Sequence, residues 1–170
     1  MALPPAHRVN HAPILIPSLD AAWDNEKIEA DKAAIKAAKG KHPEWPEASD
    51  HPTARYWNGE SRYDEATIRP WLLADVEPTR FTLRRLDQDE IDEADRLVEV
   101  GLQQRATTYC FRRGIVSVTN LDGDPVPAAP LSKDQDRELL DRIGKLARTE
   151  VAVAVYRVSQ VTLNIAEKKP

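Results

Sequence analysis

The stretch Thr79–Leu86, TRFTLRRL, is followed at once by residues 87–100, DQDEIDEADRLVEV, and together they decide the fold. In the first part, Phe81 and Leu83 alternate with polar or charged residues, which is the period-two pattern of a strand with one buried face. The second part changes to a helical spacing of apolar residues. A strand followed directly by a helix predicts an α+β domain in this part of the chain.

The helix has a recognisable start. Asp87 and Glu90 have the spacing of a capping box, with Asp in place of the usual Ser or Thr. We expect the helix to continue through the aromatic residues near position 110 as far as Gly114. One face of it is predicted to hold Ile91, Ala94, Val98 and Leu102.

This helix is strongly acidic on its other faces. Seven acids lie between Asp87 and Glu99, and Arg96 alone opposes them. Acids in the first turn are favoured by the helix dipole, so part of the run is structural. The rest predicts a solvated acidic face, and a face that docks a partner is the main alternative.

The chain beyond this helix predicts one more strand and one more helix. Residues 114–120, GIVSVTN, read as a short strand, and Ser132 with Gln135 forms a second capping box. For residues 149–159 the Val/Ala alternation suits a strand, whereas the alanines and the preceding helix suit a buried helix, which we favour. The apolar positions of the helix after Ser132 are Leu139, Leu140, Ile143 and Leu146.

The N-terminal part is rich in proline and predicts an extended arm. Proline removes a backbone donor and biases the residue before it towards extended geometry. Residues 1–19 have no helical period, yet they contain the apolar patch Ile14, Leu15 and Ile16. Three large aliphatic side chains in an extended segment indicate that the arm lies on another protein surface.

Between arm and domain, residues 20–40 are rich in Ala, Lys and Glu and predict a helix with a thin apolar stripe. The connector after it holds large aromatic side chains, including Trp45 and Trp57, which predicts a loop that packs down. We therefore divide the chain into an extended arm (1–19), a helix (20–40), a Pro/aromatic-rich connector (41–70), a small, mostly helical α+β core domain (71–165) and a charged tail (166–170).

Composition excludes several classes of protein. The 170 residues are 41% hydrophobic and 31% charged, with a formal net charge of −4, which predicts a soluble chain that does not bind nucleic acid or membrane surfaces in general. No apolar run approaches the roughly 20 residues of a membrane span, and no signal-peptide layout is present. The single cysteine excludes an internal disulfide framework and indicates a reducing cytosolic origin, or at least a fold that needs no disulfide bridges.

No motif predicts catalysis, and we expect no catalytic residue, metal site or cofactor. Glycine-rich phosphate loops and the Gly-x-Ser-x-Gly elbow do not occur in the sequence. Cys110, between Tyr109 and Phe111, is interpreted as a packing residue. The motif Asp122-Gly123-Asp124 is interpreted as a turn, because Lys133 stands where a calcium loop needs Glu. The four histidines are interpreted as turn and surface residues: His7, His11, His42 and His51.

Arginines flank the acidic helix on both sides in sequence. Paired arginines beside aromatic residues could contact phosphate, but the neighbouring acids oppose that use. We instead expect them to pair with the acidic helix, within the chain or across subunits. The set is Arg80, Arg84, Arg85, Arg112 and Arg113.

Part of the chain resembles small proteins encoded in tailed-phage and prophage morphogenesis clusters. The resemblance covers roughly residues 51–165 and lies in HP (51–52), RYWNGESRYD (55–64) and EPTRFTLRRL (77–86). Ile143-Gly144 and then VSQVTL (158–163) before a charged tail are similar to the closing pattern of phage tail-assembly chaperones. The resemblance implies no catalytic residue.

The resemblance, together with the arm, leads to an expectation about function. A non-enzymatic structural protein of a phage particle (head-surface, connector or tail), made in the bacterial host cytoplasm and located in the virion, would contact other phage structural proteins and copies of itself. A tail-assembly chaperone that binds the tape-measure chain is the alternative, and a small enzyme using Cys110 or a carboxylate pair is a third. The expected partner contacts are Ile14, Leu15 and Ile16 as an apolar latch, Trp45 and Trp57 as aromatic anchors, and Arg84 and Arg85 against an acidic partner surface.

Overall fold

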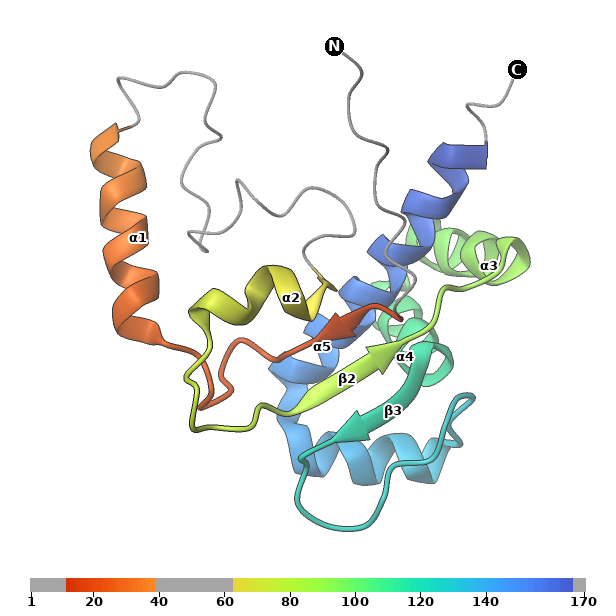
Figure 1. Cartoon of the computed structure of the whole chain (residues 1–170). Coiled ribbons are helices and arrows are strands. Elements are labelled where there is room, and N and C mark those ends of the chain that lie inside the picture. The colour runs from red at the N-terminus through yellow and green to blue at the C-terminus, as the bar shows by residue number, and fades with distance from the viewer. Residues whose placement is uncertain (1–11, 39–62, 167–170) are drawn as a thin grey trace.

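The computed structural model describes residues 12–38 and 63–166 (Figure 1). It confirms a small α+β fold in which helices predominate. The predictions on the tail beyond residue 166, on most of the connector and on Trp45 and Trp57 lie outside the described residues. In chain order the elements are β1 (Ile14–Leu15), α1 (Asn25–Ala38), α2 (Glu65–Ile68), the 3-10 turn η3 (Arg69–Trp71), β2 (Arg80–Leu83), α3 (Gln88–Glu99), α4 (Gln103–Gly114), β3 (Ile115–Thr119) and α5 (Lys133–Ala166).

The three strands form one antiparallel sheet in the order β1-β2-β3 (Figure 1). The predicted strand at Thr79–Leu86 is its central strand, and Phe81 and Leu83 are buried as the alternation requires. Residues 115–119 of the second predicted strand form β3. The first strand comes from the N-terminal segment, where Ile14 is paired with Thr82 of the same chain.

The main core lies between this sheet and the helices α3, α4 and α5. Its fully buried side chains come from all of these elements, so that no single helix–helix contact forms the core. The largest of them are Phe81, Leu83, Phe111, Ile115, Leu139, Val151, Val155 and Val158. Helix α4 and the second half of α5 come so close that an added Cβ on Gly114 would lie 2.2 Å from a methyl carbon of Val155.

A second, smaller core gathers residues of the N-terminal segment around η3. Ile16, Trp23, Ile28 and Ile68 are buried together there, and Ile14 and Trp71 are among the side chains that pack against them. The backbone of Trp23 is bridged to Leu72, and the N–H of Asp24 donates to the carbonyl of Trp71 at 2.9 Å. These contacts attach the segment before α1 to the body of the molecule.

Helix α1 begins at Asn25, five residues later than the predicted start at residue 20, because residues 17–24 form turns and the Trp23 bridge. Its first half contacts η3, where Asp31 accepts from the indole N–H of Trp71 at 2.6 Å and Lys27 donates to the carbonyl of Pro70 at 2.6 Å. The far end of α1 extends away from the sheet (Figure 1). This helix is therefore anchored at one end.

The prediction of one continuous helix from residue 87 to Gly114 is wrong. The segment forms two helices, α3 and α4, separated at Gly101, whose φ is +80°. The N–H of Gly101 donates to the carbonyl of Val98 and that of Leu102 to the carbonyl of Leu97, which is a Schellman motif. The chain turns there, which takes Leu102 off the predicted face. Val98 and Leu102 are exposed and Leu97 is buried, contrary to the prediction.

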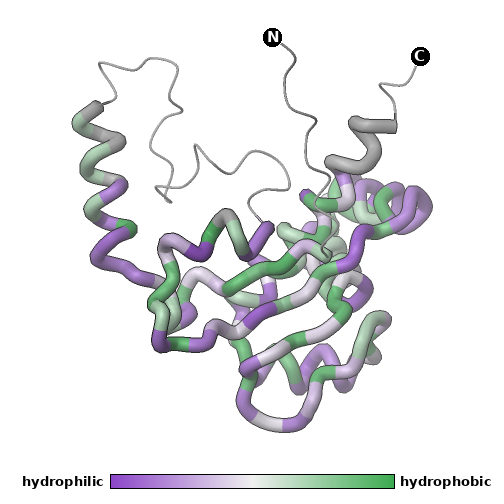
Figure 2. Tube along the Cα trace, in the orientation of Figure 1, coloured by the Kyte–Doolittle hydropathy of each residue, from purple (hydrophilic) through white to green (hydrophobic). Residues whose placement is uncertain are grey.

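The other helix predictions stand in better agreement with the structure. Both capping boxes are formed, at Asp87 with Glu90 and at Ser132 with Gln135. The ambiguous residues 149–159 are helical, as favoured, and belong to α5. Figure 2 shows α3 as a largely hydrophilic helix, in keeping with its run of acids.

Helix α5 is two helical parts joined at Gly144, where the backbone has φ 82° and ψ 166°. Figure 1 shows the parts meeting at a corner. The corner leaves Leu139 buried but Leu146 exposed, so the predicted stripe from Leu139 to Leu146 does not lie on one buried face. In the described part of the chain, no helix is both long and apolar enough to cross a membrane.

Candidate interaction surface

The predicted apolar latch packs on its own chain, which corrects the expectation that it docks on a neighbour. Ile16 is only 4% exposed, and Ile14 and Leu15 are half-buried. Successive residues of a strand point to opposite faces of the sheet, so Leu15 packs against the main core and Ile14 and Ile16 against the second core. Their apolar surface is used within the chain.

Arg84 forms an ion pair within its own chain, and its predicted contact with a partner stays a prediction. Its guanidinium donates to both carboxylate oxygens of Glu90, at 2.6 and 3.0 Å, and Arg113 donates to the same carboxylate at 3.1 Å. The prediction that arginines pair with the acidic helix within the chain is therefore confirmed for these two. Arg85 is half-buried, and Trp45 and Trp57 lie outside the described residues.

The Glu90 side chain is surrounded by positively charged groups, and the residue is buried, with only 8% of its surface exposed. Burial alone raises the pKa of this group, but hydrogen bonds from Arg84, from the backbone N–H of Asp87 and from Arg113 lower the pKa from 4.5 to about 2. A carboxylate with such a pKa stays ionised near neutral pH and does not exchange protons there. Its role in this arrangement is to connect α3, α4 and the end of β2.

A second buried carboxylate connects α4 with both parts of α5. Asp136 accepts from Arg112 at 2.8 Å and from two nitrogens of Arg148 at 3.0 Å. Burial raises the pKa of Asp136, but these hydrogen bonds outweigh it and the pKa is lowered. The guanidinium of Arg148 also lies over the ring of Phe111. Adjacent arginines at the end of α4 thus serve two different buried carboxylates.

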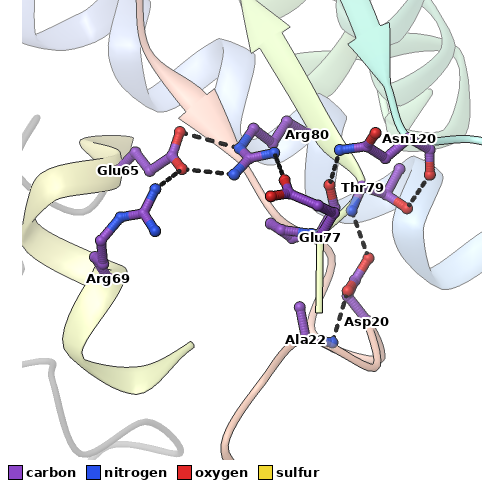
Figure 3. A network of polar contacts seen from close by, with 9 residues as sticks. Asp20, Ala22, Glu65, Arg69, Glu77, Thr79, Arg80 and Asn120 are labelled. Carbon is purple, nitrogen blue, oxygen red and sulfur yellow. Dashed lines mark hydrogen bonds and ion pairs between the residues drawn. The ribbon is translucent and has the colours of Figure 1, made fainter. Parts of the chain in front are cut away.

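A third polar network lies between α2 and β2 (Figure 3). Arg80 donates to both oxygens of Glu65, at 2.7 and 3.0 Å, and to Glu77 at 3.0 Å. Next to it, Asp20 accepts from the backbone N–H groups of Ala22 and Thr79 at 2.9 Å each. The network fastens α2 and the segment before α1 to the central strand.

The remaining chemical candidate in the described part of the chain is Cys110. Cys110 is 4% exposed, and burial, with the nearby charge of Asp95 added, raises the pKa of its thiol to about 11, so it is a protonated packing residue as interpreted from the sequence. Among the residues that the structure describes, no group of three His, Cys, Asp or Glu side chains could hold a metal ion. The histidines fall outside those residues.

Exposed aliphatic side chains form the strongest candidate for a functional surface. Leu146 and Val153 are 51% and 42% exposed and lie seven residues apart, on one face of the second part of α5. Glu150 lies between them on that face, and its carboxylate accepts from the backbone N–H of Ser18 at 3.0 Å. This contact brings the turn with Leu19, which is 81% exposed, onto the same face. We call Leu19, Leu146 and Val153 the outer strip.

A second exposed apolar group lies at the corner between α3 and α4. Val98, Val100 and Leu102 are 47%, 58% and 37% exposed there. They surround the Schellman turn at Gly101, and exposed acids of α3 such as Asp92 and Glu99 are close in sequence. We call these three residues the corner patch.

Sequence reasoning missed both surfaces for a physical reason. It assigned Val98, Leu102 and Leu146 to buried faces, because their spacing fits a helix that continues straight. The signal that could have found them is the glycine next to each group, Gly101 and Gly144, both with positive φ. A glycine that ends a helical period allows the chain to turn and leaves an apolar residue that follows it outside, as at Leu102 and Leu146.

Comparison with known proteins found no matching family model, no matching curated protein and no matching solved structure.

Proposed function

We propose that this chain is a non-enzymatic structural component of a tailed-phage particle, in its head surface, connector or tail, and that it acts through contacts with other proteins. The observation that carries the contact role is the outer strip. The phage class rests on the resemblance of residues 51–165 to proteins of phage morphogenesis clusters. The virion is the proposed location.

The outer strip has the properties of an interface centre. Large aliphatic side chains that stay exposed on a folded body favour association, because each contributes about 1.5–3 kcal/mol when it is fully buried. The opposite face of the same helix is fixed by Val151, Val155 and Val158, which are completely buried. Since the helix is held in place, little conformational entropy is lost when a partner covers the strip.

The polar networks support the same role. Glu90, Asp136 and Arg80 are each saturated by oppositely charged partners within the chain. These centres tie the helices and the sheet into one body on which exposed side chains keep their positions. A protein that occupies a repeated site in a particle needs such fixed geometry at its contacts.

The test combines particle composition with surface variants. Quantitative mass spectrometry of purified particles should find the wild-type chain at a fixed ratio to the other particle proteins. The double variant Leu146→Gln/Val153→Gln should keep its urea midpoint but be strongly depleted from particles. The matched control is Val98→Gln/Val100→Gln, the same change at the corner patch, which should enter particles as the wild type does.

Two results would overturn the proposal. If the Leu146→Gln/Val153→Gln variant entered particles at the wild-type ratio, the outer strip would not be a contact surface in the particle. A wild-type chain that is absent from mature particles, but co-purifies with the tape-measure chain from infected cells, would instead identify a tail-assembly chaperone.

A further inference from the structure

The corner in α5 depends on a single residue. Gly144 has φ 82° and ψ 166°, while the residues on both sides of it are helical. A side chain at this position would have no atom within 4 Å of its Cβ, so space does not require a glycine here. The backbone conformation does, because residues with a Cβ rarely adopt it. The two parts of α5 therefore differ from one straight helix by the two dihedral angles of Gly144.

A straight α5 would be incompatible with the contacts that its two parts make with each other. In one continuous helix, Asp136 and Arg148 would be separated by about 18 Å along the axis, since each residue adds about 1.5 Å. In the structure they form a two-point ion pair with both distances at 3.0 Å. The pair can therefore form within one chain only when the corner is present.

The terminal part of α5 fills a site that is shaped for it. Its Val155 lies against the bare backbone of Gly114, Ser159 accepts from the N–H of Leu86 at 2.8 Å, and the hydroxyl of Tyr156 donates to Asp95. If Gly144 became helical, this part would leave its own body and the site would be empty. A second copy of the chain holds the helix that matches this site residue by residue, and it would supply Arg148 to Asp136.

We propose that two copies of this chain associate by exchanging helix 145–166, with Gly144 as the hinge. The contacts of the exchanged helix are re-formed in the second copy, so the closed chain and the exchanged pair differ in the conformation of the hinge and in the entropy that is lost when two chains associate. The exchange does not rest on the proposed particle role, because it is measured on the purified chain alone.

The first experiment changes the hinge. Alanine at position 144 disfavours positive φ and favours helix, so in Gly144→Ala the balance between the single chain of 19.1 kDa and the exchanged pair of twice that mass, measured by light scattering, should shift towards the pair. The matched control is Gly101→Ala. Gly101 has φ 80° and likewise no atom within 4 Å of an added Cβ, but it does not join a terminal helix to the body. The control should lose stability and keep the wild-type mass.

The second experiment detects the exchange in a chain whose hinge is unchanged. A Ser18→Cys chain and a Glu150→Cys chain are mixed in denaturant, refolded together and treated with a short thiol-specific crosslinker. Ser18 and Glu150 are hydrogen-bonded within one body, so the two different chains are linked when the helix is exchanged. Glu138→Cys replaces Glu150→Cys in the control, because position 138 is exposed and stays with its own body.

Linked pairs from the Glu150→Cys mixture, well above those from the Glu138→Cys mixture, are the expected result. A Gly144→Ala chain that folds and keeps the monomer mass would overturn the proposal. Equal linking in both mixtures, or none in either, would overturn it as well, even if the Gly144→Ala chain failed to fold.

Discussion

Glu90 shows how one side chain can hold three segments together. It closes the capping box of α3 and accepts from Arg84 and Arg113. Replacing Glu90 with Gln should lower the free energy of unfolding at pH 7 by about 2 kcal/mol, because the half-exposed guanidinium groups of Arg84 and Arg113 lose their counter-charge and solvent screens part of that loss. Urea denaturation of the two proteins measures the difference. The matched change Glu93→Gln affects an exposed ion pair with Arg96 and should leave stability unchanged.

The same residue predicts a pH dependence. Because the pKa of Glu90 is about 2 in the folded chain and 4.5 in the unfolded chain, its contribution is complete above pH 4.5 and is lost as the pH falls towards 2. The difference in stability between wild type and Glu90→Gln should therefore shrink between pH 5 and pH 2.5. A difference that stayed constant over this range would contradict the shifted pKa.

Cys110 predicts a simple chemical measurement. Burial raises the pKa of its thiol to about 11, so very little thiolate exists at pH 8 and the sulfur is shielded from reagents. We expect no reaction with Ellman's reagent in native buffer and one thiol per chain in denaturant. Rapid labelling of the folded chain would show that this part of the core opens.

The close contact between α4 and α5 requires glycine at position 114, because Val155 of α5 occupies the space that a side chain there would fill. A Cβ at position 114 would lie 2.2 Å from one Val155 carbon and 2.8 Å from its Cβ. Gly114→Ala should therefore destabilise the chain by about 1–3 kcal/mol through overpacking. Adding Val155→Ala should restore part of that loss. Urea midpoints of the wild type, both single variants and the double variant measure the coupling, and simple additivity would show that the helices move apart freely.

Local signals were reliable where an element is determined by its own residues. The Phe81/Leu83 alternation and the two capping boxes were predicted from spacing, because strand period and cap chemistry involve neighbours in sequence. The helical face continued to Leu102 was wrong, because the Schellman turn at Gly101 redirects the chain before that residue. Periodicity alone cannot show that a helix has ended.

The N-terminal segment joins the two cores, and this predicts cooperative unfolding of the whole molecule. Leu15 packs on the main core and Ile16 in the second, so neither core is complete without residues 14–16. Ile16→Ala should lower the free energy of unfolding by about 2–4 kcal/mol. In a chain with Trp45→Phe and Trp57→Phe, fluorescence of Trp23 and Trp71 should report the second core and far-UV circular dichroism the helices of the main one.

In that chain, both signals should change at the same urea concentration, and Ile16→Ala should lower both midpoints together. Two separated transitions would show that the second core unfolds alone. An unchanged midpoint in Ile16→Ala would restore the original prediction that this residue serves a neighbouring chain.

The sequence by itself determined the class of the fold, the central strand, the starts of α3 and α5 and the helical state of residues 149–159, because these follow from local period and capping. Only the tertiary structure decided where the apolar patch at Ile14–Ile16 is buried and which carboxylates Arg84 and Arg112 bind. It also decided that Leu146 is exposed. The physical reason is that burial and ion pairing depend on segments far apart in the chain, and single glycines such as Gly101 and Gly144 set the directions in which those segments run.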